Sequence, residues 1–206
     1  MPPGLRKCAF GSALLGGYSS PMTDETAEPE AVPPTHWATD CDACLGLCCV
    51  AFAHNREAGF PAFKPLNTPC RHLAADFRCG VFDTLEKEGF KVCRAYDCFG
   101  AGPAVTDRMR SEREGWTRED VARATDHLDG FRELARLRML IVALEVEGGD
   151  EAAMVVAHLT NIAEEFRSTG EVRVDAETSI MLRSQERLIS AMLAPMDRTD
   201  GGEGSQ

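Results

Sequence analysis

Four cysteines within nine residues constrain this chain more than any other feature. The stretch CDACLGLCC runs from Cys41 to Cys49, and eight of the nine cysteines lie between Cys41 and Cys98. A scattered cysteine is usually a small buried hydrophobe, whereas cysteines clustered at short spacings indicate a disulfide framework or a metal site. Thiolates are soft ligands that select zinc, copper(I) or iron–sulfur clusters. The cluster therefore predicts one of these two kinds of cross-link for this part of the chain.

The expected cellular compartment favours a metal site over a disulfide framework. No apolar run approaches the roughly 20 residues that a membrane helix needs. Arg6 and Lys7 precede a short apolar stretch at 9–15, which is a weak match to a signal peptide because glycines interrupt it, and Met22 is an alternative start. We expect a cytoplasmic protein without a membrane partner, and reducing conditions there oppose structural disulfides.

The cysteines supply enough ligands for more than one ion. A structural zinc takes four ligands in a tetrahedron. The predicted ligands are the eight clustered cysteines, Cys41, Cys44, Cys48, Cys49, Cys70, Cys79, Cys93 and Cys98. They allow two tetrahedral sites, or one cluster with additional structural or reactive thiols. If residues 41–49 are helical, with Thr39 or Asp40 as the N-cap, then Cys41, Cys44 and Cys48 share one face.

The cysteine-rich segment differs in net charge from the rest of the chain. The formal net charge is −11 and no basic stripe is present, so we expect no nucleic-acid partner. Between Cys41 and Gly102, seven Lys/Arg balance seven Asp/Glu. The balanced charge of this segment suits a thiolate site. Two zinc ions with eight thiolates carry a charge of about −4, and further negative charge nearby would be unfavourable.

The remaining pattern predicts four segments. Residues 1–37 are rich in Gly, Ser, Pro and Glu and are expected to be disordered, as is the tail at 198–206. Residues 38–103 form the cysteine-rich metal-binding module, which closes at Gly100-Ala101-Gly102. Residues 104–197 form a helical segment. The expected fold class is mainly α, a small irregular cysteine-rich module packed with a C-terminal three-helix segment.

Three amphipathic helices are expected in the helical segment. The first carries apolar residues from Val121 to Leu144 and ends at Gly148-Gly149. The second is capped by Asp150, has its apolar stripe at Met154, Ala157, His158, Ile162 and Phe166, and ends at Gly170. The third runs from Asp175 to Pro195, with Met181, Leu182, Leu188, Ile189, Met192 and Leu193 on its apolar face.

The order of the eight cysteines, CxxCxxxCC followed by four single cysteines that end in a Cys-x4-Cys pair, resembles the YkgJ-like family of zinc- or iron-chelating cysteine-cluster proteins. The resemblance implies that all eight are metal ligands. The family commonly has Arg-Pro before its penultimate cysteine, where this chain has Gly89-Phe90-Lys91-Val92.

Residues 40–145 are also similar, and more closely, to the cysteine-rich leader of some actinobacterial pentapeptide-repeat proteins. The shared motifs are Gly46-Leu47-Cys48-Cys49, Lys64-Pro65, Pro69-Cys70, Asp76-Phe77-Arg78-Cys79-Gly80 and Tyr96-Asp97-Cys98-Phe99-Gly100-Ala101-Gly102. No five-residue apolar period follows Gly102, so the resemblance covers the leader without its repeats.

Spacing argues against several other cofactors. The cysteines fit neither the bacterial ferredoxin run nor the radical-SAM order, although a non-standard iron–sulfur cluster remains an alternative to zinc. Cys41 and Cys44 lack the βαβ context of a thioredoxin-like pair. His54 and His72 are candidates for a base or a substitute ligand, but a role as loop or surface residues is the simpler interpretation, and we assign no catalytic residue.

These features predict a metal-binding protein, with zinc as the first choice and iron or an iron–sulfur cluster as the second. In the favoured interpretation the protein is a non-enzymatic binding or regulatory module that contacts a protein partner through its helical segment. The alternative is an iron–sulfur or thiolate-dependent oxidoreductase, or a metal-dependent modifying enzyme.

Overall fold

The computed structural model describes residues 37–113, 115–117, 119–176 and 178–180, and the structural statements below concern these residues. Cys8 and the predicted tail lie outside them, as do the predicted N-terminal segment up to residue 36 and most of the third predicted helix. Residues up to Arg173 form one compact unit and residues from Val174 form a second. The first unit contains all eight clustered cysteines.

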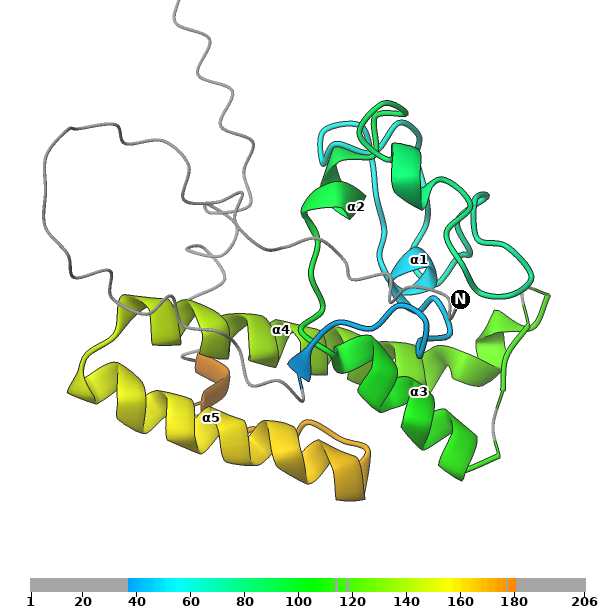
Figure 1. Ribbon diagram of the computed structural model, residues 1–206. Coiled ribbons are helices and arrows are strands. Elements are labelled where there is room, and N and C mark those ends of the chain that lie inside the picture. Colours follow the sequence, from blue (N-terminus) through cyan, green and yellow to red (C-terminus); the bar gives the residue numbers. More distant parts are fainter. Residues whose placement is uncertain (1–36, 114, 118, 177, 181–206) are drawn as a thin grey trace, which may run out of the picture. The chain divides into compact units, whose positions relative to one another are not determined.

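Helices dominate the described residues, which confirms the expected mainly α fold (Figure 1). They contain no β-strand, only two isolated antiparallel bridges, His54 with Lys64 and Leu73 with Cys79. The α-helices are α1 (Cys48–Ala51), α2 (Lys91–Ala95), α3 (Ala101–Ser111), α4 (Thr125–Glu147) and α5 (Asp150–Thr169), and the 3-10 helices are η2 (Phe82–Thr84) and η3 (Val121–Ala124). None of these helices combines the length and apolar character that a membrane span requires.

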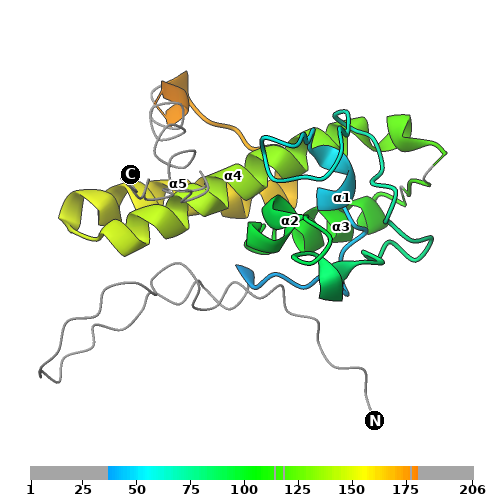
Figure 2. The same ribbon diagram turned by 90° about the horizontal axis from the view of Figure 1, so that it is seen from above.

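Helix α4 is the central element of the first unit, and it contacts α1, α3, α5 and η3 (Figures 1 and 2). The predicted apolar face is confirmed, because Leu128, Phe131, Leu134, Leu137, Ile141 and Leu144 are all buried. Gly148 is the C-cap of α4, as predicted. Gly130 has no side chain, so the ring of Phe166 from α5 can pack close to the backbone of α4. A Cβ at this position would lie 3.4 Å from that ring. The two long helices therefore pack antiparallel at close range.

The apolar stripe predicted for α5 is correct only in its second half. Ile162 and Phe166 are buried as expected, but Met154 is 73% exposed, and Leu159 and Ala163 line the core instead. Ala157 and His158 of the predicted stripe are also exposed, whereas Leu159 in the same turn is buried, so the buried face is offset around the helix from the predicted one. Asp150 is the first helical residue, whereas Gly149 is the N-cap. Gly170 ends the helix in the left-handed conformation, as predicted.

The prediction missed helix α3, and the expected module boundary at residue 103 falls inside it. Gly100-Ala101-Gly102-Pro103 resembles a loop in sequence, but Pro is tolerated in the first turn of a helix. Val105, Thr106 and Met109 then form a buried face. The cysteine-rich residues and the long helices are thus joined through α3.

Residues 38–100 are mostly turns and loops, in agreement with the expected irregular module. Their apolar core contains Leu47, Val50, Phe60, Leu73, Leu85 and Phe90. Phe60 packs edge-on against Phe90, with ring centroids 4.9 Å apart. Phe63, however, is 77% exposed. Phenylalanines therefore form only part of the core of this module.

Candidate metal centre

The first cysteine block is not a helix as a whole, which corrects the prediction for residues 41–49. Residues 41–44 form a turn, and α1 begins only at Cys48. Asp40 does act as a cap, but its Oδ1 accepts the N–H groups of Asp42 and Ala43 within this turn. Gly46 then has φ +66°, and a Cβ there would lie 2.8 Å from the carbonyl oxygen of Phe77. The left-handed glycine ends the turn, so the sulfurs are arranged by tertiary contacts and not by helical periodicity.

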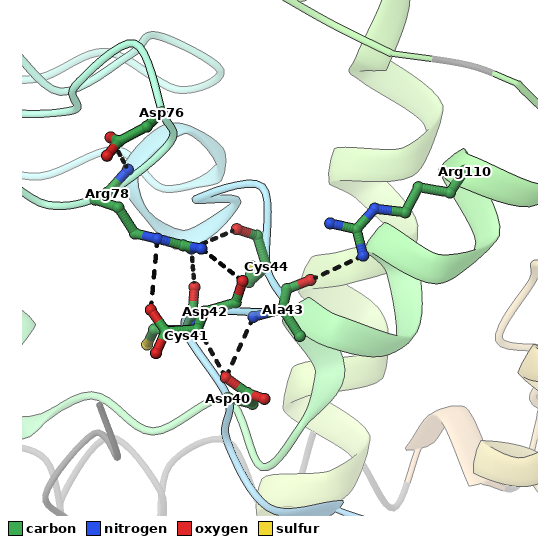
Figure 3. Close-up of polar contacts among 8 residues, drawn as sticks. All are labelled: Asp40, Cys41, Asp42, Ala43, Cys44, Asp76, Arg78 and Arg110. Atoms are coloured by element: carbon green, nitrogen blue, oxygen red, sulfur yellow. Dashed lines mark hydrogen bonds and ion pairs between the residues drawn. The ribbon is translucent and has the colours of Figure 1, made fainter. Parts of the chain in front are cut away.

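Arg78 holds this turn from a neighbouring loop (Figure 3). Its guanidinium donates to the carbonyl oxygens of Cys41, Asp42 and Cys44. On the other side, Arg110 from α3 donates to the carbonyl of Ala43 at 3.4 Å. Two cations therefore fix the backbone that carries Cys41 and Cys44.

Cys44 and Cys98 meet at the start of α3, although they are far apart in sequence. A Cβ placed on Gly102 would lie 2.8 Å from the sulfur of Cys44 and 3.6 Å from that of Cys98. Thr106, one turn later, accepts the N–H of Leu45 at 3.0 Å and hydrogen-bonds the Cys44 side chain. Gly102 therefore provides the space in which the two sulfurs sit.

A second set of sulfurs adjoins the first through α1. The Cys49 side chain hydrogen-bonds those of Cys48 and Cys79, and its carbonyl accepts the N–H of Cys70 at 2.9 Å. Cys93 interacts electrostatically with Cys48, Cys70 and Cys79. Cys48 interacts with both sets, since it also raises the pKa of Cys44 and Cys98. Seven of the eight predicted ligands are thus linked to one another by these interactions.

Burial decides the protonation of most of these thiols. It raises the pKa of Cys44 to about 11 and that of Cys93 and Cys98 to about 12. The hydrogen bond from Cys49 lowers the pKa of Cys79 to about 7. Without a bound cation, Cys44, Cys93 and Cys98 are therefore neutral at pH 7. A metal ion has to displace their protons, because the thiolate is the ligand.

A buried lysine lies beside the second set. Lys64 is 5% exposed, and its ammonium donates to the carbonyl oxygens of Val50, at 2.9 Å, and of Phe52, at the C-terminal end of α1. Burial lowers its pKa, and nearby Cys70, Cys49, Cys93 and Cys48 act in the opposite direction. A lysine is almost never this buried unless its charge is compensated. Its position therefore fits a set of thiolates better than a set of neutral thiols.

Replacing Lys64 with methionine should destabilise the protein by about 2–4 kcal/mol, because two buried carbonyls lose their donor while the apolar volume is kept. Denaturant unfolding of the purified protein measures this change. Lys87→Met, at an exposed position, is the matched control and should change stability by no more than about 0.5 kcal/mol. If the two variants unfolded at the same denaturant concentration, the Lys64 ammonium would have no structural role.

Cysteine sulfur is the type of donor that soft metal ions select. None of the eight described cysteines is in a disulfide. Among residues 37–180, as far as they are described, no group of three or more His, Cys, Asp or Glu side chains is arranged so that it could hold a metal ion. Binding of a metal would therefore require deprotonation of the thiols and rearrangement of their side chains.

The other predicted candidates have structural roles. His54 stacks on Phe60 with centroids 4.8 Å apart, and burial followed by the charge of Lys64 lowers its pKa to about 4. His72 accepts from Arg71 Nε at 2.8 Å and packs against Phe90. Asp97 is a turn residue, since it accepts the N–H of Phe99 at 2.7 Å. These contacts support the simpler interpretation of the three residues.

Comparison with known proteins adds one uncharacterised relative. The chain is 32% identical over 153 residues to the uncharacterized protein YybG of Bacillus subtilis (strain 168). The match covers 74% of this chain and 50% of YybG, so the chain spans about half the length of this relative. No family model and no solved structure matches the chain. The name of this relative states no activity, so we infer the function of the chain from the candidate site.

Proposed function

We propose that this protein is a cytoplasmic metal-binding module in which cysteine thiolates hold zinc and thereby fix the fold of residues 38–103. One observation carries the proposal. Cysteines from separated loops have adjoining sulfurs beside α1 and α3, and none of those described is in a disulfide. The nearby cations of Lys64, Arg78 and Arg110 offset the thiolate charge. The cysteine order supports membership of the YkgJ-like cysteine-cluster family and a relationship to the leader module of pentapeptide-repeat proteins.

In this proposal we assign the ligands to two groups of four. The first comprises Cys41, Cys44, Cys48 and Cys98, and the second comprises Cys49, Cys70, Cys79 and Cys93. Bound zinc would cross-link loops that contain only short helices and two isolated bridges among the described residues. The proposed protein partner would bind the helical segment, where Val146 and Met154 are 63% and 73% exposed near the α4–α5 connection.

A thiolate-dependent activity is the second candidate, and one observation favours it. Cys79 lines a surface cleft together with Arg78, Asp42, Asp76 and Asp83. Its pKa of about 7 keeps a large fraction of this thiol ionised at neutral pH. A partly ionised thiol at the edge of a surface cleft is a candidate for a reactive cysteine. An iron–sulfur centre in the same sulfurs would belong to this alternative.

Metal analysis of the full chain, purified without oxygen, tests the proposal. We expect a colourless protein with about two zinc ions per chain. Cys98→Ser should reduce the zinc content to about one ion, whereas Cys8→Ser, outside the cluster, should leave it unchanged. A brown protein with iron and acid-labile sulfide would favour the second candidate. A metal-free protein with paired cysteines would contradict both.

A further inference from the structure

An apolar surface is left uncovered where α4 turns into α5. Val146, in the last turn of α4, is exposed, and so are Ala153, Met154 and Ala157 of α5. We call these four residues the hairpin-end surface. A Cβ added to either glycine of the connection between the helices would meet no atom within 4 Å, so the connection is open as well. This end of the helical hairpin is therefore accessible to a partner.

The composition of α5 beside this surface is that of a helix surrounded by other elements. Residues 152–157 read Ala-Ala-Met-Val-Val-Ala, with no polar side chain over more than a full turn. A helix that is apolar all round is normally buried. No residue from 150 to 158 is buried, however, and the buried residues of α5 begin at Leu159. The first half of α5 thus has the apolar character of a core helix and lacks the cover, which marks an interaction surface.

Four carboxylates border the hairpin-end surface, and no Lys or Arg lies among them. They belong to Glu145, Glu147, Asp150 and Glu151, and the chain has no Lys or Arg from residue 139 to residue 166. None of the four forms an ion pair or a side-chain hydrogen bond with the described residues. The two in α5 suit the N-terminus of that helix. Glu145 and Glu147, however, lie in the last turn of α4, where the helix dipole disfavours negative charge. Helix stability therefore does not account for them.

We propose that the hairpin-end surface binds a basic amphipathic helix of another protein. The apolar face of that helix would cover Val146 and Met154, and its Lys and Arg side chains would pair with the four bordering carboxylates. A second copy of this chain fits less well, because it would bring the carboxylates of both copies together without a cation.

This inference rests on the proposed function only in specifying the protein partner, and it needs no bound metal. The α4–α5 connection lies at the end of α4 that is remote from α1 and α3 (Figures 1 and 2). The partner and the cysteines therefore occupy different ends of the same unit, and the two can be tested separately.

Binding of model helices to the full chain tests the proposal. The probe is a fluorescent amphipathic peptide with Leu on one face and Lys on the other. It should bind one chain with micromolar affinity, and salt should weaken the binding because exposed charges are screened. A peptide with Glu in place of Lys, and a Leu/Lys peptide of scrambled order, should bind at least about 10-fold more weakly. Equal binding of the acidic peptide, or no binding of the basic one, would overturn the proposal.

Met154→Glu locates the binding surface. The substitution removes an apolar side chain and adds negative charge, so a purely electrostatic attraction would become stronger, whereas the proposed contact should weaken at least about 10-fold. Asn161→Glu is the matched control, because it adds the same charge at an exposed position two turns further along α5. It should change the affinity by less than about 2-fold. Equal affinities of the two variants would place the peptide elsewhere and overturn the proposal.

Neutralising two carboxylates measures the electrostatic part of the binding. Glu147→Gln combined with Glu151→Gln should lower the affinity about 3- to 10-fold and reduce its dependence on salt. An unchanged salt dependence would contradict the pairing of the peptide's Lys side chains with these carboxylates.

Two other occupants of the hairpin-end surface would give different results. If a second copy covered it, the full chain would be a dimer that Met154→Glu converts to a monomer. If residues 181–206 of the same chain covered it, the peptide would bind only after their removal. Either result would overturn the external partner. The zinc content of each sample is measured alongside, so a metal-free chain that still binds the peptide would contradict the proposed metal binding alone.

Discussion

Removal of the proposed zinc with a chelator should unfold residues 38–100 while α4 and α5 remain helical. The cysteine-rich residues contain only short helices, α1, η2 and α2, and no strand among those described. Structural zinc contributes about 10–16 kcal/mol in small zinc-dependent domains, far more than so small a core can supply. The long helices have a separate core around Leu134, Leu137 and Ile141. Hydrogen exchange should therefore accelerate across residues 38–100, while the amides within α4 and α5 stay protected.

Two controls sharpen this experiment. Adding back zinc should restore the slow exchange, whereas magnesium should not, because a hard cation prefers oxygen ligands. Far-ultraviolet circular dichroism should change little, since most helical residues lie in α3, α4 and α5. Slow exchange in residues 38–100 after complete metal removal would show that the fold of this segment does not depend on a cation.

Gly100→Ala should destabilise the protein by about 3–4 kcal/mol. Gly100 has φ +72°, which costs an L-residue about 1–2 kcal/mol. The new Cβ would also lie 2.7 Å from the carbonyl oxygen of Trp37 and 2.9 Å from its Cα, so the backbone has to move. Trp37 cannot retreat easily, because its ring lies 5.0 Å from the Arg138 guanidinium and its Nε1 donates to Glu164 at 3.1 Å. Denaturant unfolding of the metal-loaded protein measures the loss.

Gly115→Ala is the matched control for this substitution. A Cβ at Gly115 meets no atom within 4 Å, so stability should change by no more than about 0.5 kcal/mol. If Gly100→Ala were as stable as this control, the close approach of Trp37 to the start of α3 would not be a constraint on folding. The same comparison tests whether Trp37 is part of the folded unit.

The expected C-terminal ends of the two long helices were accurate because they depend on local signals. Gly148 and Gly170 end α4 and α5 where the sequence places them, since glycine adopts the left-handed conformation at little cost. The expected start was less accurate, because Val121 lies in η3 and α4 begins at Thr125. The apolar repeat of α4 identified its buried face, whereas that of α5 placed Met154 on a face that is exposed.

For the candidate site, the ligand set of eight cysteines stays a prediction, whereas the predicted local geometry is wrong. Cysteine spacing placed Cys41, Cys44 and Cys48 on one face of a helix, but residues 41–49 do not form that helix. Helical periodicity was inferred from spacing alone, whereas the Asp40 cap and Gly46 impose a turn. No local pattern indicated that Lys64 is buried.

The sequence by itself determined that this is a mainly α chain with eight cysteines confined to one irregular segment, because composition, spacing and helix signals act over a few residues. Only the tertiary structure decided which groups surround the sulfurs. Gly102 and Thr106 approach the cysteine block from α3, and Lys64 and Arg78 approach it from separate loops. Such contacts join residues far apart in the chain, and packing of the whole unit is what brings them together.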